Sequence, residues 1–217
     1  MGAAVRLERL LDALAAEPDP PTTVRDPVEA LDLHVADSLS GLEIEELRAA
    51  GRIADVGAGA GFPGLPLAIA LPGSQVDLIE STRRKCEVIE RLAAAADIDN
   101  ARSFPARAEE WAAGEGREGY QAVTVRAVAP LAVLLEYAAP LLVEGGVLVA
   151  WKGGRDEDEE RRGCTAAGRL GMEPMEVRAA RPFPGAHSRH LHVHRKIAPT
   201  PAGLPRRPGV ARKRPLA

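Results

Sequence analysis

The stretch ADVGAGAGFPG, residues 54–64, places four glycines and one aspartate within eleven residues. Glycine loses more backbone entropy on folding than any other residue, so this density is unfavourable inside a regular helix or strand. Glycine is used where another group must approach the backbone closely. The stretch therefore predicts a loop that holds a ligand against the main chain, and the flanking residues must indicate which ligand.

The residues on either side of the loop predict a strand before it and a helix after it. The strand is RIADVG (52–57), and the helix is PGLPLAIALPG (63–73), which Pro72 and Gly73 close. Backbone N–H groups in the first turn of a helix lack partners, and the helix dipole adds roughly half a positive charge there. A loop of this kind suits a nucleotide-like ligand.

The glycines can be read in two registers, which predict different ligands. Gly59, Gly61 and Gly64 match the G-x-G-x-x-G pattern of dinucleotide-binding folds. Gly57, Gly59 and Gly61 match G-x-G-x-G, which with an acid two residues earlier is typical of S-adenosylmethionine (SAM) enzymes. That acid is Asp55, which would repel a pyrophosphate and attract the ammonium and sulfonium groups of SAM.

Residues at the ends of the next two predicted strands support a nucleoside ligand. Glu80 ends QVDLIE (75–80), where an acid accepts hydrogen bonds from the ribose hydroxyls of NAD and SAM alike. Ala108 and Glu109 follow the third strand, where the edge of an adenine would lie. Together with Asp55 these residues favour SAM, and an NAD-dependent oxidoreductase remains the alternative.

From residue 51 onward, short apolar runs alternate with helical stretches. This alternation predicts an α/β fold, an open and mostly parallel central sheet with helices on both faces. We expect three parts: a short N-terminal helical cap (1–50), a SAM-binding domain (51–197) and an extended or disordered tail (198–217) rich in Pro and Gly.

Charge is unevenly distributed along the chain. Segment 189–217 carries eight basic residues and no acid, which leaves −11 for the remainder because the whole chain carries −3. This asymmetry predicts either a polyanionic partner for the basic tail or a solvated end. The two cysteines have no metal or redox spacing, which favours a reducing, cytoplasmic compartment. No apolar run approaches the roughly 18–20 residues of a membrane span, so we expect no membrane association.

Three histidines near the end of the chain suggest a metal site at first sight. His190, His192 and His194 would share one face of a strand, but no carboxylate or cysteine lies near them in the sequence. We therefore expect a solvated face of an edge strand and no metal ion.

Several stretches together resemble one family, the bacterial small-subunit ribosomal RNA methyltransferase G family, also called glucose-inhibited division protein B. They are DVGAGAGFPGLPLAIALP, VDLIES, RAEEW, VTVRAVAPLAVLLEYAAPLL, VAWKG and the tail KIAPTPAGLPRRPGVARKRPL. The similarity extends over nearly all of residues 22–217. It implies a class I SAM-dependent methyltransferase (Rossmann-like) fold and methylation of N7 of one guanine in 16S ribosomal RNA.

The resemblance also implies roles for individual residues. Those beside the cofactor would be Gly57, Phe62, Ala108 and Glu109. Arg126 would face the active site, and the stretch HVADS would place His34, Asp37 and Ser38 at its mouth. One departure is PDPPTTVRDP (18–27), which lacks the N-L-T motif that usually precedes this point in the family.

The implied reaction needs little catalytic machinery. Guanine N7 carries a lone pair and no proton, so its attack on the methyl group needs alignment rather than a general base or a metal ion. Arg126 would fix the base, a phosphate or SAM, and Asp37 would stabilise the cationic product. We expect the enzyme to act as a monomer whose partner is 16S ribosomal RNA or the small ribosomal subunit.

Three other functions stay open at this point. The chain could be a SAM methyltransferase of a small molecule or protein, although the basic tail argues against it. It could be the NAD-dependent oxidoreductase named above. It could also be an RNA-binding module that has lost methyl transfer, because its N-terminal cap is short.

Overall fold

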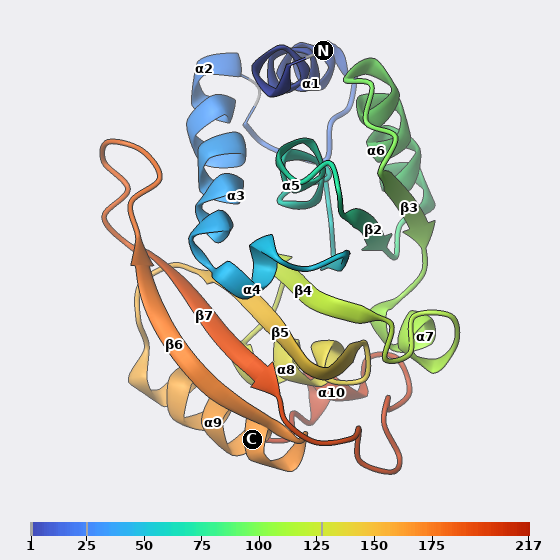
Figure 1. Ribbon diagram of the computed structural model, residues 1–217, viewed down its shortest axis with the longest axis vertical. Coiled ribbons are helices and arrows are strands. Elements are labelled where there is room, and N and C mark those ends of the chain that lie inside the picture. Colours follow the sequence, from blue (N-terminus) through green and yellow to red (C-terminus); the bar gives the residue numbers. More distant parts are fainter. Residues whose placement is uncertain (1, 25, 127) are drawn as a thin grey trace.

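A seven-stranded sheet forms the centre of the computed structural model, which describes residues 2–24, 26–126 and 128–217. Its strands are β1 (Arg52–Val56), β2 (Gln75–Glu80), β3 (Ala101–Pro105), β4 (Tyr120–Arg126), β5 (Leu142–Lys152), β6 (Met172–Ala180) and β7 (Arg189–Lys196). The order across the sheet is β3-β2-β1-β4-β5-β7-β6 (Figure 1). Strands β1 to β5 are parallel, and β7 runs antiparallel to both of its neighbours. The strand order reverses between β1 and β4, where ligands bind in sheets of this kind.

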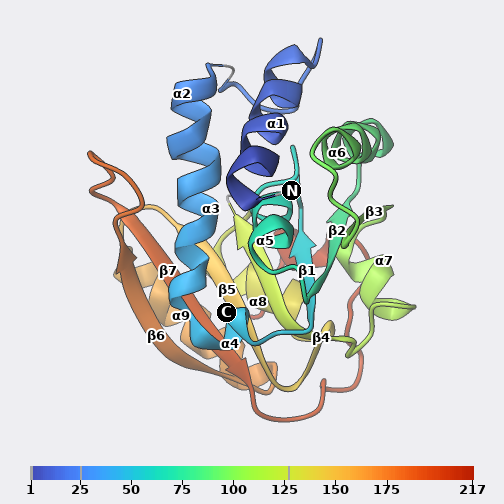
Figure 2. The same ribbon diagram turned by 45° about the horizontal axis from the view of Figure 1, so that its top comes forward.

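Helices cover both faces of the sheet, which confirms the predicted architecture (Figures 1 and 2). The helices of one face are α1 (Ala3–Ala16), α2 (Pro27–Ala30), η1 (Leu31–Ala36), α3 (Asp37–Leu39), η2 (Ser40–Glu43), α4 (Glu45–Arg48), α5 (Gly64–Ala70) and α6 (Arg83–Ala95). Those of the other face are α7 (Ala108–Ala113), α8 (Leu131–Ala138), α9 (Glu157–Arg169) and α10 (Val210–Lys213). None of these helices is both long and apolar enough to cross a lipid bilayer.

Alternating side chains of the strands supply two hydrophobic cores, one on each face. In β5, Val149 points into the core beneath α1, α4, α5 and α6, whereas Leu148 points into the core beneath α8 and α9. Burial on both faces explains why the strands read as continuous apolar runs. Leu10 of α1 and Leu47 of α4 belong to the first core, so the cap over residues 1–50 packs with the sheet rather than apart from it.

The segment 27–43 consists of four short helical pieces of different type. Asp26 caps its start, because the Asp26 carboxylate accepts hydrogen bonds from the backbone N–H groups of Val28 and Glu29, both at 3.0 Å. The α2 helix then widens into the π-helical η1, continues as α3 and tightens into the 3₁₀ helix η2. Wide turns of the π type occur often at functional sites.

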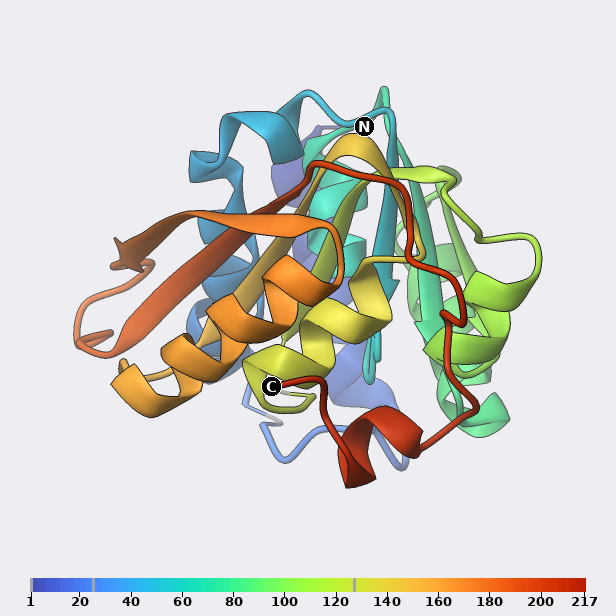
Figure 3. The same ribbon diagram turned by 90° about the horizontal axis from the view of Figure 1, so that it is seen from below.

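The segment 198–217, predicted as extended or disordered, has no helix or strand before α10 but is attached to the rest of the fold. The segment passes beside α7 and ends in α10, which packs on α8 (Figure 3). The Arg206 guanidinium forms a two-bond ion pair with the buried Glu136, and the backbone N–H of Gly209 donates to Glu109 at 2.9 Å. Ala211 is 1% exposed. These partners lie far away along the chain, so local composition could not reveal them.

The expectation of a solvated histidine face on an edge strand is wrong. Strand β7 lies between β5 and β6, and His192 and His194 are buried. Burial lowers the pKa of both imidazoles, that of His194 to about 4, so both are neutral near pH 7. Among the residues that the structure describes, no three His, Cys, Asp or Glu side chains gather as metal ligands would.

Removal of the ion pair that anchors the tail should destabilise the protein. Glu136 is 3% exposed, so Arg206→Ala would leave a buried carboxylate without its partner. We expect the free energy of unfolding to fall by about 3 kcal/mol in urea denaturation. Arg207→Ala, which removes an exposed neighbouring charge, is the control and should leave stability nearly unchanged. Equal stability of both variants would contradict a structural role for the pair.

Candidate active site

The glycine loop lies at the carboxyl end of β1, with its backbone in conformations that favour glycine. Gly57 and Gly59 have φ values of +72° and +59°. A Cβ atom at Gly57 would lie 2.7 Å from Cγ2 of Val128, in the loop after β4. The loop therefore packs so closely against its neighbour that Gly57 admits no side chain.

Asp55 lies beneath this loop rather than in a pocket. It is 1% exposed, and its Oδ2 accepts a hydrogen bond from the Gly64 N–H at 2.8 Å. Its Oδ1 is 3.3 Å from the hydroxyl of Thr124, its register partner on β4. The expected contact of Asp55 with the ammonium of SAM is thus corrected to a supporting role, in which its carboxylate ties the start of α5 to β1 and β4.

Burial changes the protonation of this carboxyl group. It raises the pKa of Asp55 to about 7, although the hydrogen bond from Gly64 and the positive charge of Arg126 both act to lower the pKa. The pKa of Asp55 therefore lies in the neutral range, far above the ordinary value for an aspartic acid.

A cavity of about 400 Å³ opens above the glycine loop. It is lined by His34, Gly57, Ala58, Gly59, Ala60, Phe62, Glu80, Ser81, Lys85, Arg126, Val128 and Arg212. We call it the loop pocket. Glu80, at the end of β2, is its acid: Oε2 accepts from the Gly59 N–H at 3.1 Å and Oε1 from the Thr82 N–H at 2.9 Å. Oε1 also accepts from the Ser81 hydroxyl at 3.3 Å, so Oε2 is the oxygen that keeps a lone pair for a ligand.

The residues predicted at the adenine edge do not line the loop pocket. Ala108 and Glu109 form the start of α7, and both are buried. The Glu109 carboxylate accepts the hydrogen bond from Gly209 of the C-terminal segment. This segment, rather than α7, reaches the pocket, because Arg212 lies in its wall.

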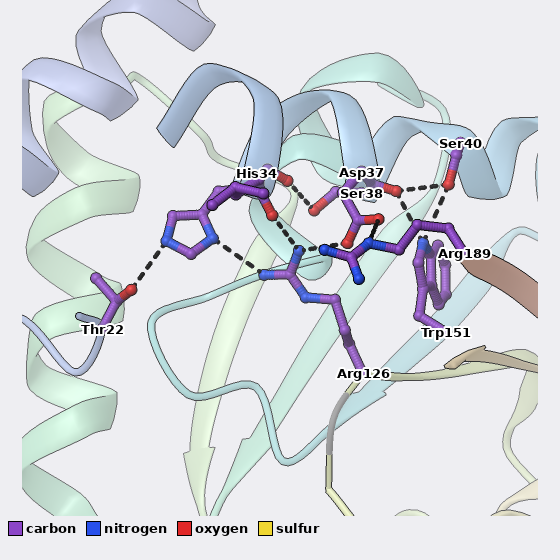
Figure 4. Close-up of polar contacts among 9 residues, drawn as sticks. Thr22, His34, Asp37, Ser38, Ser40, Arg126, Trp151 and Arg189 are labelled. Atoms are coloured by element: carbon purple, nitrogen blue, oxygen red, sulfur yellow. Dashed lines mark hydrogen bonds and ion pairs between the residues drawn. The ribbon is translucent and has the colours of Figure 1, made fainter. Parts of the chain in front are cut away.

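His34 and Phe62 stack at the rim of the loop pocket, with ring centroids 4.6 Å apart. Nδ1 of His34 lies 3.4 Å from Nη2 of Arg126, and Nε2 lies 2.9 Å from the hydroxyl of Thr22 (Figure 4). Arginine can only donate, so Nδ1 is the acceptor and the ring proton resides on Nε2. Burial and the charge of Arg126 lower the pKa of His34 to about 4, so this imidazole is neutral near pH 7.

Arg126 ends β4 and joins the sheet to the N-terminal helices. Its Nη1 donates to the carbonyl oxygen of Leu33 and to Oδ2 of Asp37, both at 3.0 Å (Figure 4). On its other side, Asp37 Oδ1 lies 3.4 Å from Nε of Arg189. Asp37 Oδ1 and Arg189 Nε both lack a hydrogen-bond partner among the described residues. Asp37 is thus a buried carboxylate shared between two guanidinium groups.

A second cavity, of about 370 Å³, opens beside Asp37. It is lined by Leu33, His34, Asp37, Arg126, Trp151, Lys152, Gly153 and Arg189, and we call it the arginine pocket. His34 and Arg126 line both cavities, so ligands in the two pockets would meet at these side chains. Ser38, predicted at the mouth, lines neither pocket, since its buried hydroxyl donates to the carbonyl of His34.

Several lining residues were missed from the sequence. Trp151 and Lys152 end β5, next to β4 in the sheet, and their place at the carboxyl end of a strand is the signal that could have found them. The indole N–H of Trp151 donates to the Asp37 carbonyl at 2.8 Å. Apart from their positive charge, nothing in the sequence around Arg189 and Arg212 indicates that they line a pocket.

Comparison with known proteins identifies relatives and structural neighbours. Residues 21–191 match the sequence profile of the family described as rRNA small subunit methyltransferase G. A protein of that name from Rubrobacter xylanophilus is 46% identical over 200 residues, which cover 88% of this chain and 75% of that protein.

Solved structures with a similar fold include proteins described as methyltransferases, at low sequence identity. A predicted O-methyltransferase from Agrobacterium tumefaciens has a TM-score of 0.59 at 24% identity and covers 75% of this chain and 81% of its own. P. horikoshii TYW2 in complex with MeSAdo has a TM-score of 0.55 at 12% identity, over 70% of this chain and 60% of its own. These neighbours confirm the class I methyltransferase fold.

Replacement of Asp55 should alter how stability depends on pH. The folded protein binds more protons than the unfolded chain between pH 3.8 and about 7, so Asp55 lowers the free energy of unfolding as pH rises through that range. Asp55→Asn keeps an acceptor for the Gly64 N–H and removes the titration. Urea denaturation should show the variant gaining stability relative to the parent from pH 4 to 7, by up to about 4 kcal/mol. A difference that does not change with pH would contradict the raised pKa.

Proposed function

Because the chain belongs to the rRNA small subunit methyltransferase G family and is a methyltransferase, we propose that it methylates N7 of one guanine in 16S ribosomal RNA. The observation that carries this proposal is the meeting of the loop pocket and the arginine pocket at Arg126 and His34. One pocket offers an acid beside bare backbone, and the other offers cationic side chains and an indole. We propose that the enzyme acts as a monomer in the cytoplasm.

The loop pocket is the site for SAM, the methyl donor of this enzyme. SAM supplies, when bound, a methyl group that its sulfonium makes electrophilic. Gly57 and Gly59 would let it lie against the main chain, beside the Phe62 ring, and Glu80 would accept hydrogen bonds from its ribose hydroxyls. Gly61 does not line this pocket, because the space at its Cβ position is filled by Leu65. The fit is supported by the buried Glu80 carboxylate, which lines the cavity and whose Oε2 keeps a lone pair for a ligand.

The arginine pocket would receive the guanine. Its N7 has a free lone pair, so no side chain has to remove a proton, and orientation alone can lower the barrier by roughly 7–11 kcal/mol. Arg126 is suited to this task because Leu33 and Asp37 hold its guanidinium in place before any ligand binds. Its remaining N–H groups would hold O6 of the base or a phosphate group.

Asp37 acts on the substrate through its two arginines. Stabilisation of a cationic product would need excess negative charge, but one carboxylate between Arg126 and Arg189 leaves this cluster positive. Lys152 adds no excess charge, because it is paired with Glu159. We therefore assign Asp37 as the positioning residue of the two guanidinium groups, and assign the positive cluster to the phosphates and carbonyl oxygens of RNA.

The basic tail contributes less free charge to RNA binding than its sequence predicts. Of its eight basic residues, four already form ion pairs with carboxylates of the fold: Arg189, Arg195, Lys196 and Arg206. The other four are exposed: Arg207, Arg212, Lys213 and Arg214. Arg212 donates to the carbonyl oxygen of Val128 and lines the loop pocket, so Arg207, Lys213 and Arg214 are the cations proposed to meet phosphates, each adding about 0.7–0.9 to the salt dependence of binding.

A methyl-transfer assay tests the reaction and the substrate together. Labelled SAM would be supplied with small ribosomal subunits or with naked 16S RNA, both lacking native methylation. We expect label in 7-methylguanosine on nucleoside analysis. Label in another nucleoside would contradict the proposed position, and no transfer to either RNA form, with SAM still bound, would contradict the ribosomal substrate.

A pair of matched variants tests the division of the site into two pockets. Glu80 lines only the loop pocket and Asp37 only the arginine pocket, and each can be changed to its amide. Glu80→Gln should raise the Kd for SAM about tenfold or more, because charge-assisted hydrogen bonds are lost. Asp37→Asn should leave that Kd within about twofold and lower kcat/KM for RNA by roughly 10–100-fold, since Arg126 loses its orientation. The assignment fails if Asp37→Asn weakens SAM binding as much as Glu80→Gln does.

A further inference from the structure

One residue of the loop pocket comes from the last turns of the chain. Arg212 lies in α10, far along the chain from the glycine loop, yet it lines the same cavity as Gly59 and Glu80. Its Nη2 donates a hydrogen bond to the carbonyl oxygen of Val128 at 3.1 Å. The C-terminal segment therefore reaches into the pocket that the first strand, the second strand and the loop after β4 build.

The segment is tied to two helices of the fold, α7 and α8, which do not themselves line this pocket. Arg206 pairs with Glu136 of α8, and the Gly209 N–H donates to Glu109 at the start of α7. Between these attachments and the last residues, Ala211 is buried in the core beneath α8 and α9. The segment passes along this side of the molecule before α10 turns under α8 (Figure 3). An ion pair, a backbone hydrogen bond and an apolar contact therefore all hold the segment in place.

Val128 connects Arg212 to the glycine loop. Its methyl groups fill the space that a side chain at Gly57 would need, and its carbonyl is the acceptor for Arg212. A shift of the loop after β4 would open the wall against which Gly57 packs. Arg212 thus acts on the cofactor pocket in two ways, as part of its lining and as the anchor of Val128.

We propose that segment 204–216 is part of the SAM site, with Arg212 forming one wall of the loop pocket and holding Val128 against the glycine loop. The adenine ring of SAM is planar and carries nitrogen acceptors, which suits it to a guanidinium group with N–H donors to spare. Docking of the segment and binding of SAM then stabilise each other by the same free energy. This proposal rests on the proposed function in taking SAM as the ligand of the loop pocket.

The first test is the affinity for SAM without RNA, measured by calorimetry on the full chain. Arg212→Ala should raise the Kd about tenfold or more. The matched control is Arg214→Ala, which removes the same charge from an exposed side chain that makes no hydrogen bond to a described residue, and it should change the Kd less than twofold. Equal Kd values for the Arg212 variant and the parent, or equal losses in both variants, would overturn the proposal. Thermal unfolding of each variant verifies that it is folded.

Hydrogen exchange supplies a second readout on the segment itself. Saturating SAM should slow exchange of the backbone amides in 204–216, and Arg212→Ala should remove most of that slowing. Unchanged exchange in this segment, together with protection of the glycine loop, would overturn the coupling while leaving SAM binding intact. Failure of the unmodified protein to bind SAM at all would instead contradict the proposed function.

Discussion

The ion pair between Arg126 and Asp37 joins the N-terminal helices to the sheet where the strand order reverses. Both side chains are largely buried, so their removal from water costs several kcal/mol that the fold must offset. It does so with further partners, the Leu33 carbonyl for Arg126 and the Arg189 guanidinium for Asp37. The π-helical turn η1 and the start of α3 bring Leu33 and Asp37 to this point, so the irregularity of the 27–43 segment serves the same contact.

The charge of Arg126 reaches the groups of both pockets. It helps keep His34 neutral by lowering the pKa of that imidazole, and it counteracts the effect of burial on Asp55. The two pockets consequently differ in character although they share a wall. The loop pocket has an acid, Glu80, beside bare backbone, whereas the arginine pocket has a positive cluster around one carboxylate. The two surfaces thus complement the occupants proposed for them, a cationic, sulfonium-bearing donor and a polyanionic acceptor.

The basic end of the chain shows how a charge pattern divides between folding and binding. Part of its positive charge is neutralised within the protein, because Arg206 pairs with Glu136 and Lys196 pairs with Glu118. The Arg206 pair attaches the C-terminal segment to α8, and the exposed cations remain for a partner. An unordered tail would offer every charge to a polyanionic partner but would lose its contact with the loop pocket.

Local features of the sequence determined most of the fold. The alternation of apolar runs and helical stretches predicted the strands and helices, because each depends on contacts of a few residues' range. The spacing of Gly57, Gly59 and Gly61 predicted the loop. The apolar run before Glu80 likewise predicted that this acid ends a strand. Only the tertiary structure decided that Asp55 lies beneath the loop, that β7 is interior and that the tail is docked. These features depend on partners far apart along the chain, as with Arg126 and Asp37 at a separation of 89 residues or Gly209 and Glu109 at 100. Residue type and periodicity carry no record of such pairings, because they form only when the sheet and its two helical layers assemble.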